Sequence, residues 1–434
     1  MATIRSFDRT EEIEAELVQP DRFRDLFDHL HKSDSIARGA GLNYCLAGAV
    51  ANGQTVLSNR FNRFLAFDPK RGTVVVEPGV TMGDLFEFAT ARSLLPPVLP
   101  GHPQITVGGA VAMNIHGKNQ HRVGNFGDHV RSLTLYHPDY KEISCSPSET
   151  SNVFWLTVGG FGLTGFVLSV EIELMPLAGT TLTVERRKVG NLTEAAQMLN
   201  DLGNSADYLY SWHDLNRRGS DFGCGVIYIE RFSPVGSSAA IRRIPSTPFK
   251  PFPVIVLNNM TLPIMCRLYR LKETLSTRKK TEDLFTASFP IVGKEIYFRL
   301  FGQRGFREYQ LLVAAGAWPA FLEDLTRVIR GCRIPIALAS LKLMRGTVRY
   351  LNFNGNGISL ALDVLNVPSS VDLFAKLDEI TLKAGGIANI AKDSRLSADV
   401  VRRMYSGYQT FRNELRAYDP SLRFQSQLRR RLSL

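Results

Sequence analysis

Short apolar runs alternate with amphipathic stretches over the first 180 or so residues, and glycine turns separate them. Residues 55–58 and 73–80 are rich in β-branched side chains, which favours strands. Residues 81–92 instead repeat apolar side chains at helical spacing, with Thr81 in the position of an N-cap. The expected apolar face consists of Met82, Leu85, Phe86 and Ala89. This alternation predicts a mixed fold of the α/β or α+β kind.

Residues 166–176 alternate apolar and polar positions up to Pro176, and glycine becomes less frequent beyond them. We therefore expect a first domain over residues 1–180 and a second over residues 181–386. The second domain mixes apolar β-runs with a helical pattern at 317–330, which predicts a sheet with helices on one side. Its strands are expected at 225–229, 309–313 and 358–364.

The last segment, residues 387–434, carries one helical stretch at 398–415 and a basic end at Arg429, Arg430 and Arg431. Terminal charge runs are usually solvated, so solvation is the expectation for these arginines.

Composition narrows the class of protein. The chain has 434 residues, 44% of them hydrophobic and 21% charged, which suits two globular domains. It contains no apolar run of the ~18–20 residues that a membrane span needs and no signal-peptide pattern at its start, so we expect a cytoplasmic protein. Five scattered cysteines indicate neither a disulfide framework nor a zinc ribbon.

The net charge of +11 favours an anionic partner, such as nucleic acid, an acidic membrane surface or a phosphorylated substrate. No nucleic-acid-binding motif is present, so we expect no nucleic-acid partner. The histidines His116, His121 and His129 are close in sequence but lack accompanying carboxylates or cysteines at ligand spacing, so no metal site is predicted.

Four glycine-rich turns fall in the first domain, at residues 38–44, 99–101, 106–110 and 159–165. Glycine lets backbone N–H groups converge and approach a ligand closely, which suits a diphosphate. The motif G-x-G-x-x-G at 160–165 is followed by a strand pattern rather than a helix, which argues against a Rossmann NAD site. A P-loop motif is also missing. The turns therefore predict a large phosphorylated cofactor of another kind.

The order and spacing of these turns resemble the flavoprotein superfamily of vanillyl-alcohol oxidase, aldonolactone oxidases and alditol oxidases. The likeness is closer to the decaprenylphosphoryl-β-D-ribose oxidase family. It covers residues 36–176 and 385 to the end, and its segments are 98–101, 106–110, 115–119, 124–132, 154–165 and 391–395. The resemblance implies an α+β fold in which residues 1–180 and 387–434 form an FAD-binding domain of the PCMH type. Residues 181–386 would form the substrate domain.

The resemblance also assigns the cofactor site. Superfamily members often attach flavin to a histidine near the end of the first glycine turn, but residues 42–45 contain none. We therefore expect non-covalent FAD, with His116 as the less favoured attachment point. The residues expected to bind FAD are Arg38, Gly39, Ala40, Gly41, Leu42, Asn43, Tyr44, Pro100, Gly101, Thr106, Gly108, Gly109, Asn114, His116, Gly162, Thr164, Gly165 and Lys392.

By position in the matching motifs, the resemblance gives catalytic roles to Lys392, His116 and Lys118. A lysine acts as a base only if burial or a nearby cation lowers its pKa, whereas a charged lysine stabilises a developing alkoxide. We favour the electrostatic role for Lys392. The residues expected to bind substrate are Lys118, Trp212, Gln310, Lys342, Ser359, Ala361 and Lys392.

Three pocket positions depart from the family pattern. Ala361 stands where the family has a cysteine, Ser359 where it has an asparagine, and Ser288 near a position usually held by tyrosine. None of these groups supplies the hydride acceptor. The departures therefore put the substrate in doubt rather than the flavin chemistry.

Residues 249–280 combine an apolar, proline-broken stretch with a group of cations. Such a combination suits a peripheral contact with an anionic membrane, because hydrophobic insertion and electrostatic attraction add. The alternative is a core strand followed by a solvated basic helix. The cations are Arg267, Arg270, Lys272, Arg278, Lys279 and Lys280.

The leading hypothesis implied by the resemblance is FAD-dependent oxidation of the C2′ hydroxyl of a polyprenyl-phosphoryl pentose. This would be the first half of an epimerisation that a separate NAD(P)H-dependent reductase completes. One alternative is an oxidase of a soluble sugar alcohol or aldonolactone. Another is a membrane-associated scaffold with a vestigial flavin fold.

Overall fold

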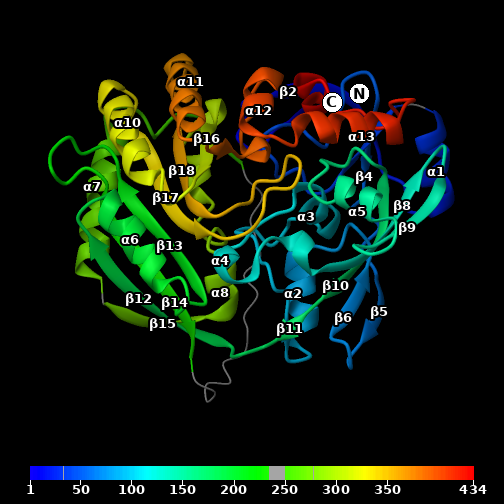
Figure 1. Cartoon of the computed structure of the whole chain (residues 1–434), viewed down its shortest axis with the longest axis horizontal. Coiled ribbons are helices and arrows are strands. Elements are labelled where there is room, and N and C mark those ends of the chain that lie inside the picture. Colours follow the sequence, from blue (N-terminus) through cyan, green and yellow to red (C-terminus); the bar gives the residue numbers. More distant parts are fainter. Residues whose placement is uncertain (33, 234–249, 277) are drawn as a thin grey trace.

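A computed structural model describes residues 1–32, 34–233, 250–276 and 278–434. Strands and helices from the first part of the chain occupy one side of the molecule, and those from residues 181–388 occupy the other (Figure 1). The C-terminal helices return to lie beside the first strands, so the two ends of the chain are neighbours (Figure 1). This arrangement confirms the predicted α+β fold.

The first part of the chain contains two main sheets. One has the order β1-β2-β4-β3, with β1 at Ala2–Arg5, β2 at Glu12–Val18, β4 at Gln54–Leu57 and β3 at Ser35–Arg38. The other has the order β5-β6-β10-β8-β9, with β5 at Phe64–Asp68, β6 at Thr73–Val76, β10 at Phe166–Glu173, β8 at Val130–His137 and β9 at Lys141–Cys145. The helices here are α1 (Phe23–Lys32), α2 (Met82–Thr90), α3 (Val107–Met113), α4 (Gln120–Val123) and α5 (Ser151–Thr157). The short strands β7 (Leu94–Leu95) and β11 (Met175–Pro176) pair with each other.

Helix α2 forms as the apolar pattern predicts. The Thr81 hydroxyl oxygen accepts a hydrogen bond from the backbone N–H of Asp84, and the Asp84 carboxylate accepts one from the backbone N–H of Thr81. This capping box satisfies two N–H groups that an isolated helix end leaves unpaired. All four residues of the predicted apolar face are buried in the core beneath the second sheet.

The second part also contains two sheets. One has the order β13-β14-β12-β15, with β13 at Tyr208–Asp214, β14 at Cys224–Phe232, β12 at Thr181–Val189 and β15 at Lys279–Asp283. The other has the order β17-β18-β16-β19, with β17 at Ile336–Met344, β18 at Gly357–Leu365, β16 at Phe306–Val313 and β19 at Ile387–Ala388. Its helices are α6 (Leu192–Leu202), α7 (Thr261–Leu275), α8 (Leu284–Ser288), α9 (Ile296–Arg299), α10 (Trp318–Gly331) and α11 (Pro368–Lys383). The domain boundaries at 180 and 386 stay a proposal, since β19 still pairs with β16.

The helix predicted as one stretch at 398–415 is in fact two, α12 (Ala398–Met404) and α13 (Tyr408–Tyr418). The chain turns between them, where the Tyr405 hydroxyl donates a hydrogen bond to the carbonyl of Ala388. A Cβ added at Gly407 would lie 2.7 Å from Cα of Tyr350, so glycine permits a close backbone contact at this turn. The one-helix prediction was wrong because a contact with a distant segment breaks the helix.

The expectation of a solvated basic end was also wrong for two of its three arginines. Helix α14 (Gln427–Leu432) carries Arg429, whose side chain is 1% exposed and lies 2.9 Å from the Asp419 carboxylate. Arg431 forms an ion pair with Glu11 at 3.5 Å. The arginines therefore attach the C-terminal helix to the rest of the fold, because a buried cation requires a partner.

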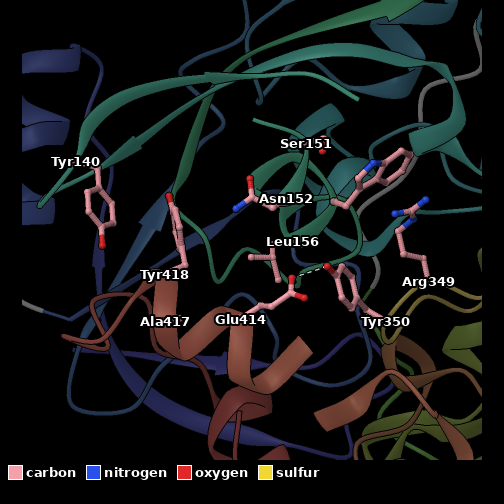
Figure 2. A pocket seen from close by; sticks show the side chains of 10 residues that line it. Tyr140, Ser151, Asn152, Leu156, Arg349, Tyr350, Glu414, Ala417 and Tyr418 are labelled. Carbon is pink, nitrogen blue, oxygen red and sulfur yellow. Dashed lines mark hydrogen bonds between the residues drawn. The ribbon is translucent and has the colours of Figure 1, made fainter. Parts of the chain in front are cut away.

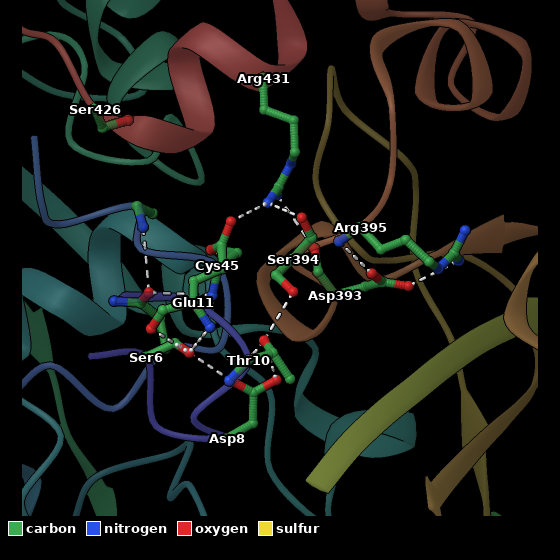
Figure 3. A network of polar contacts seen from close by, with 12 residues as sticks. Ser6, Asp8, Thr10, Glu11, Cys45, Asp393, Ser394, Arg395, Ser426 and Arg431 are labelled. Carbon is green, nitrogen blue, oxygen red and sulfur yellow. Dashed lines mark hydrogen bonds and ion pairs between the residues drawn. The ribbon is translucent and has the colours of Figure 1, made fainter. Parts of the chain in front are cut away.

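Figure 3 shows the polar network at this junction, which joins both ends of the chain to the loop after Lys392. Arg431 donates hydrogen bonds to the carbonyl oxygens of Ser394 and Asp393. The hydroxyls of Ser394 and Thr10 lie 2.8 Å apart, and Thr10 in turn donates to Asp8. Burial raises the pKa of Glu11 to about 7 and that of Asp8 to about 6.

This network predicts a pH-dependent effect of Glu11→Gln. Because the pKa of Glu11 is raised on folding, its contribution to stability is complete below about pH 4.5 and is lost as the pH rises through about 7. Glutamine cannot ionise, so the melting temperature of the variant relative to the unaltered protein should increase between pH 5 and pH 8. Thermal unfolding at both pH values measures this difference.

The matched control is Glu323→Gln at an exposed position of α10, whose difference in melting temperature should be the same at the two pH values. If the melting temperature of Glu11→Gln relative to the unaltered protein stays constant or falls between pH 5 and pH 8, the pKa of Glu11 is not raised in the folded protein.

Candidate functional site

Three of the four glycine turns, at 38–44, 106–110 and 159–165, gather around one cavity of about 180 Å³, and the turn at 99–101 does not line it. The loop after β3, the start of helix α3 and the turn before β10 line it, together with Lys392. Of the residues predicted to bind FAD, those that line the cavity are Arg38, Gly39, Ala40, Gly41, Leu42, Asn43, Thr106, Gly108, Gly109, Gly162, Gly165 and Lys392. Segments more than 300 residues apart thus contribute to a single site, as the motif order led us to expect.

Arg38 and Gly41 give the cavity the chemistry that a diphosphate requires. Gly41 has a φ of +70°, and a Cβ there would lie 2.2 Å from Nη2 of Arg38, so glycine is needed both for its conformation and for its close contact. Burial lowers the pKa of Arg38, and the described residues place no carboxylate within ion-pair distance of its guanidinium. A half-buried cation without an acidic partner, beside glycine N–H groups, fits the phosphates of FAD.

Six of the predicted FAD residues, His116 among them, do not line the cavity, and their assignment stays a prediction. Asn114 accepts a hydrogen bond from the N–H of Gly127, and the hydroxyl of Thr164 lies 2.9 Å from that of Thr157. A Cβ at Gly101 would lie 3.2 Å from Cδ1 of Ile291, and Pro100 is buried outside the cavity lining. The ring of Tyr44 lies below Lys392, with Nζ 4.1 Å from its centroid.

The other lining residues were not selected from the sequence, because small and apolar side chains fill ordinary cores equally well, although Ile115, Phe161 and Ala391 lie within the resembling motifs. These residues are Ala37, Gly48, Ser58, Pro78, Ile105, Ala112, Met113, Ile115, Phe161, Phe166, Val167 and Ala391.

One face of the β17-β18-β16 sheet is polar. Strand register places Gln310 opposite Ala361 and Lys342 opposite Ser359, and residues opposite one another share a face. Glu308 and Asp363 are opposite one another on the same face. Gln310 Nε2 donates to His116 Nε2 at 3.2 Å and to the Ser359 hydroxyl at 3.3 Å. The structure therefore joins three predicted site residues directly.

The polar contacts of His116 define its protonation. Burial lowers its pKa to about 3, and the neighbouring cations Lys342 and Lys392 add to this effect. The imidazole is therefore neutral near pH 7. Since Gln310 donates to Nε2, we assign the ring hydrogen to Nδ1, which lies 3.4 Å from the carbonyl of Gly117. His116 is thus a neutral, oriented group rather than a cation.

Lys342 and Lys392 differ in their surroundings. Lys392 Nζ lies 3.4 Å from the carboxylate of Glu308, a residue that the sequence analysis did not select. Lys342 has neither a hydrogen bond nor an ion pair among the described residues, and burial with the nearby charge of Lys392 lowers its pKa to about 8. Lys342 therefore meets the condition for a lysine base, a role that its sequence position did not indicate.

Lys118 and Trp212 lie toward the other sheet of the substrate part. Lys118 Nζ is 3.2 Å from both carboxylate oxygens of buried Glu230 and 4.7 Å from the Tyr210 ring centroid. Trp212 packs edge-on against Tyr269, with ring centroids 4.8 Å apart. Leu338 lies on the polar face of the β17-β18-β16 sheet. It packs against the hydrophobic cluster that contains Trp212. Ser288 is buried, and its hydroxyl has no hydrogen-bond partner among the described residues.

A second pocket, of about 570 Å³, lies among α5, α13 and residues 349–350 (Figure 2). The Tyr350 hydroxyl donates a hydrogen bond of 2.6 Å to Glu414, and the Arg349 guanidinium stacks on Trp155 at 4.0 Å. None of the predicted site residues lines this pocket. We therefore place the candidate active site at the glycine-lined cavity.

Comparison with known proteins agrees with this placement. The family described as "FAD binding domain" matches residues 29–146. The chain is 30% identical to decaprenylphosphoryl-beta-D-ribose oxidase of Mycolicibacterium smegmatis over 418 residues, which is 92% of this chain and 89% of that protein. It is 33% identical to human Delta(24)-sterol reductase over 112 residues, 26% of this chain and 22% of that protein. It is 28% identical to D-lactate dehydrogenase of Anaerostipes hadrus over 146 residues, 32% of this chain and 31% of that protein.

Fold, cavity and family match together define an FAD-dependent oxidoreductase. The extent of the likeness to the Mycolicibacterium protein narrows this class further. The chain belongs to the decaprenylphosphoryl-β-D-ribose oxidase family.

The geometry at Arg38 predicts that Gly41→Ala weakens FAD binding by about tenfold or more, because the new methyl group displaces the guanidinium and strains the backbone. Flavin content after dialysis, together with titration of the apoprotein with FAD, measures the loss.

Gly72→Ala is the matched control. Gly72 has a similar φ of +65°, but its added Cβ would make only an ordinary contact, 3.4 Å from the carbonyl oxygen of Leu174. Equal losses of FAD affinity in both variants would show that backbone strain alone, rather than the position of Arg38, explains the effect.

Proposed function

We propose that the protein binds FAD non-covalently and oxidises the C2′ hydroxyl of a polyprenyl-phosphoryl pentose, such as decaprenylphosphoryl-β-D-ribose, to the 2′-keto sugar. The observation that carries the proposal is that Lys392, which lines the FAD cavity, pairs with Glu308 on the polar face of the substrate sheet, and that Lys342 belongs to the same face. The name of the Mycolicibacterium relative supports the choice of substrate. Two cations suit both a phosphorylated sugar and an alkoxide.

Alcohol oxidation requires that a proton and a hydride leave the same carbinol. Bound FAD supplies the hydride acceptor. Lys342 takes the hydroxyl proton in its neutral form, which its pKa of about 8 makes accessible near neutral pH. Lys392 remains the electrostatic partner of the developing negative charge. Gln310 and neutral His116 orient the sugar, because their mutual hydrogen bond fixes both side chains.

The departures at Ser359 and Ala361 leave this chemistry intact. Ser359 accepts a hydrogen bond from Gln310, and Ala361 lies opposite Gln310 without a polar group of its own. We infer that sugar recognition relies on Gln310 and the lysines. The keto product would then pass to a separate NAD(P)H-dependent reductase, because the motif at 160–165 leads into strand β10 rather than a helix.

Contact with an anionic membrane is part of the proposal, and helix α7 is the surface for it. Residues 253–256 do not form the core strand considered above, since Val254, Ile255 and Val256 are exposed in a loop. Residue 249, where that segment begins, lies outside the described residues. Along α7 and just before it, an exposed apolar row consists of Met260, Ile264, Leu268, Leu271 and Leu275. No helix among the described residues is long and apolar enough to cross a membrane.

The cations of this surface are not equivalent. Arg278 and Lys280 lie near acidic partners, at 3.9 Å from Glu185 and 2.7 Å from Glu282. Arg267 and Lys272 lie on α7 without an ion-pair partner among the described residues. Apolar side chains beside unpaired cations favour an anionic bilayer over a neutral one. A soluble substrate would need no such surface, which disfavours an oxidase of a soluble sugar alcohol or aldonolactone. A purified protein without flavin would favour the scaffold alternative.

Lys392→Ala should retain FAD but lose substrate-driven flavin reduction by ~10²-fold or more, the scale expected when a preorganised charge is removed. Stopped-flow mixing with a polyprenyl-phosphoryl pentose under anaerobic conditions measures the rate. The exposed Lys383→Ala variant, whose lysine pairs with Asp324 on the outer helices, serves as the control. Near-normal reduction in Lys392→Ala would assign Lys392 a structural role.

The membrane contact predicts that Leu268→Ser with Leu271→Ser weakens binding to anionic vesicles, and that raised salt weakens it as well. Screening shortens the Debye length from ~10 Å at 0.1 M to ~3 Å at 1 M. Turnover of a long-chain substrate should fall more than that of a short-chain analogue, since only the former is taken from the bilayer. Vesicle co-sedimentation and turnover with both substrates measure these effects.

The control is Leu422→Ser, at an exposed apolar position near the C-terminal helices. Equal losses of turnover on both substrates would place Leu268 and Leu271 in the fold instead. An absence of vesicle binding at low salt would exclude the membrane contact.

A further inference from the structure

Two carboxyl groups face each other beside Lys392. Glu308 on β16 and Asp363 on β18 are directly opposite in the strand register, so both side chains lie on the polar face of the sheet. Glu308 forms the ion pair with Lys392 at 3.4 Å. Asp363 is 2% exposed, and its Oδ2 accepts a hydrogen bond of 2.8 Å from the Tyr297 hydroxyl. The pair thus lies directly behind a lysine that lines the FAD cavity.

The surroundings of Asp363 favour its protonated form. Its Oδ1 is buried and has no hydrogen-bond partner in the part of the chain that the structure describes, whereas a carboxylate oxygen would require one. Burial raises the pKa of Asp363 well above its usual range, and the charge of Glu308 raises it further, while Tyr297 and Lys392 oppose this change. Two like charges at directly opposite positions of a buried sheet face cannot both be held without a large cost. One proton therefore remains on the pair.

We propose that Glu308 and Asp363 are positioning residues for Lys392, and that together they hold one proton and one negative charge that fix the ammonium group at the flavin. The inference rests on the proposed place of Lys392 beside FAD. It extends that proposal by naming what holds Lys392 there and what limits the positive charge that the flavin experiences. A single negative charge anchors Lys392, whereas two would cancel its effect on the cavity.

Sulfite binding to the oxidised flavin tests the charge balance without any sugar substrate. Sulfite is an anion, so its affinity rises when positive charge near the flavin is less compensated. Glu308→Gln removes the compensating charge and should tighten sulfite binding by about tenfold. Asp363→Asn replaces a neutral carboxyl with a neutral amide, so sulfite affinity at pH 7 should stay within about twofold. Titration of the purified holoprotein, followed by flavin absorbance, measures both dissociation constants.

A second pair of variants guards against misfolding of the first. Glu308→Asp keeps the charge but lengthens its distance from Lys392, so sulfite affinity should lie between those of the unaltered protein and Glu308→Gln. Asp363→Ser is another neutral replacement and should match Asp363→Asn. FAD content and melting temperature identify any variant that fails to fold. Glu308→Gln should also slow flavin reduction by substrate, because Lys392 loses its anchor.

The outcomes separate this inference from the proposed function. If Asp363→Asn or Asp363→Ser tightens sulfite binding as much as Glu308→Gln does, Asp363 is ionised and the shared proton is excluded. If Glu308→Gln leaves sulfite affinity unchanged, Glu308 does not act on the charge at the flavin, and the inference fails. If the sulfite affinities are as expected but a polyprenyl-phosphoryl pentose does not reduce the flavin, the role of the carboxyl pair stands and the proposed substrate is wrong.

Discussion

The ion pair between Lys392 and Glu308 joins the two halves of the molecule at the point where the chemistry is placed. Lys392 lines the cavity of the glycine turns, and Glu308 belongs to the substrate sheet. A lysine held by one carboxylate remains a cation in a defined position, whereas an unrestrained one would turn toward solvent. The neighbouring pKa values of His116 and Lys342 are lowered partly because this cation is present. Burial is the larger cause of both shifts, and the contact with Glu308 fixes the position of the cation that adds to them.

The loop that carries Lys392 is itself held by the two ends of the chain. Arg431 and Thr10 bond to the backbone and side chain of residues 393–394, and Arg395 pairs with both Asp393 and Asp378. These bonds bring together the loop between β1 and β2, helix α14 and helix α11, which are distant in sequence. Part-buried ionic networks of this kind are strong only when every member is paired. This explains how a C-terminal helix that does not line the cavity holds the loop that follows Lys392.

Local patterns were sufficient to predict elements such as α2 and three of the glycine turns that line the cavity. The N-cap and apolar face of α2 follow from adjacent residues, and glycine turns such as Gly39 and Gly41 were recognisable because their chemistry is contained in a few positions. Glu308 and Asp363 were missed because they are 55 residues apart in sequence and become a pair only through strand register. Arg429 was assigned to solvent because its partner, Asp419, is apparent only after the chain has folded back. The break between α12 and α13 likewise depends on Tyr350, a residue outside the segment.

In the proposed function, the lipid-linked sugar reduces the flavin, and α7 is the surface that collects this sugar from the bilayer. The most direct test mixes the oxidised holoprotein anaerobically with decaprenylphosphoryl-β-D-ribose, a soluble alditol and an aldonolactone in parallel, and follows the loss of flavin absorbance. The account predicts rapid loss with the polyprenyl-phosphoryl pentose and a 2′-keto product. Rapid reduction by the alditol or the aldonolactone, with none by the lipid-linked pentose, would contradict it.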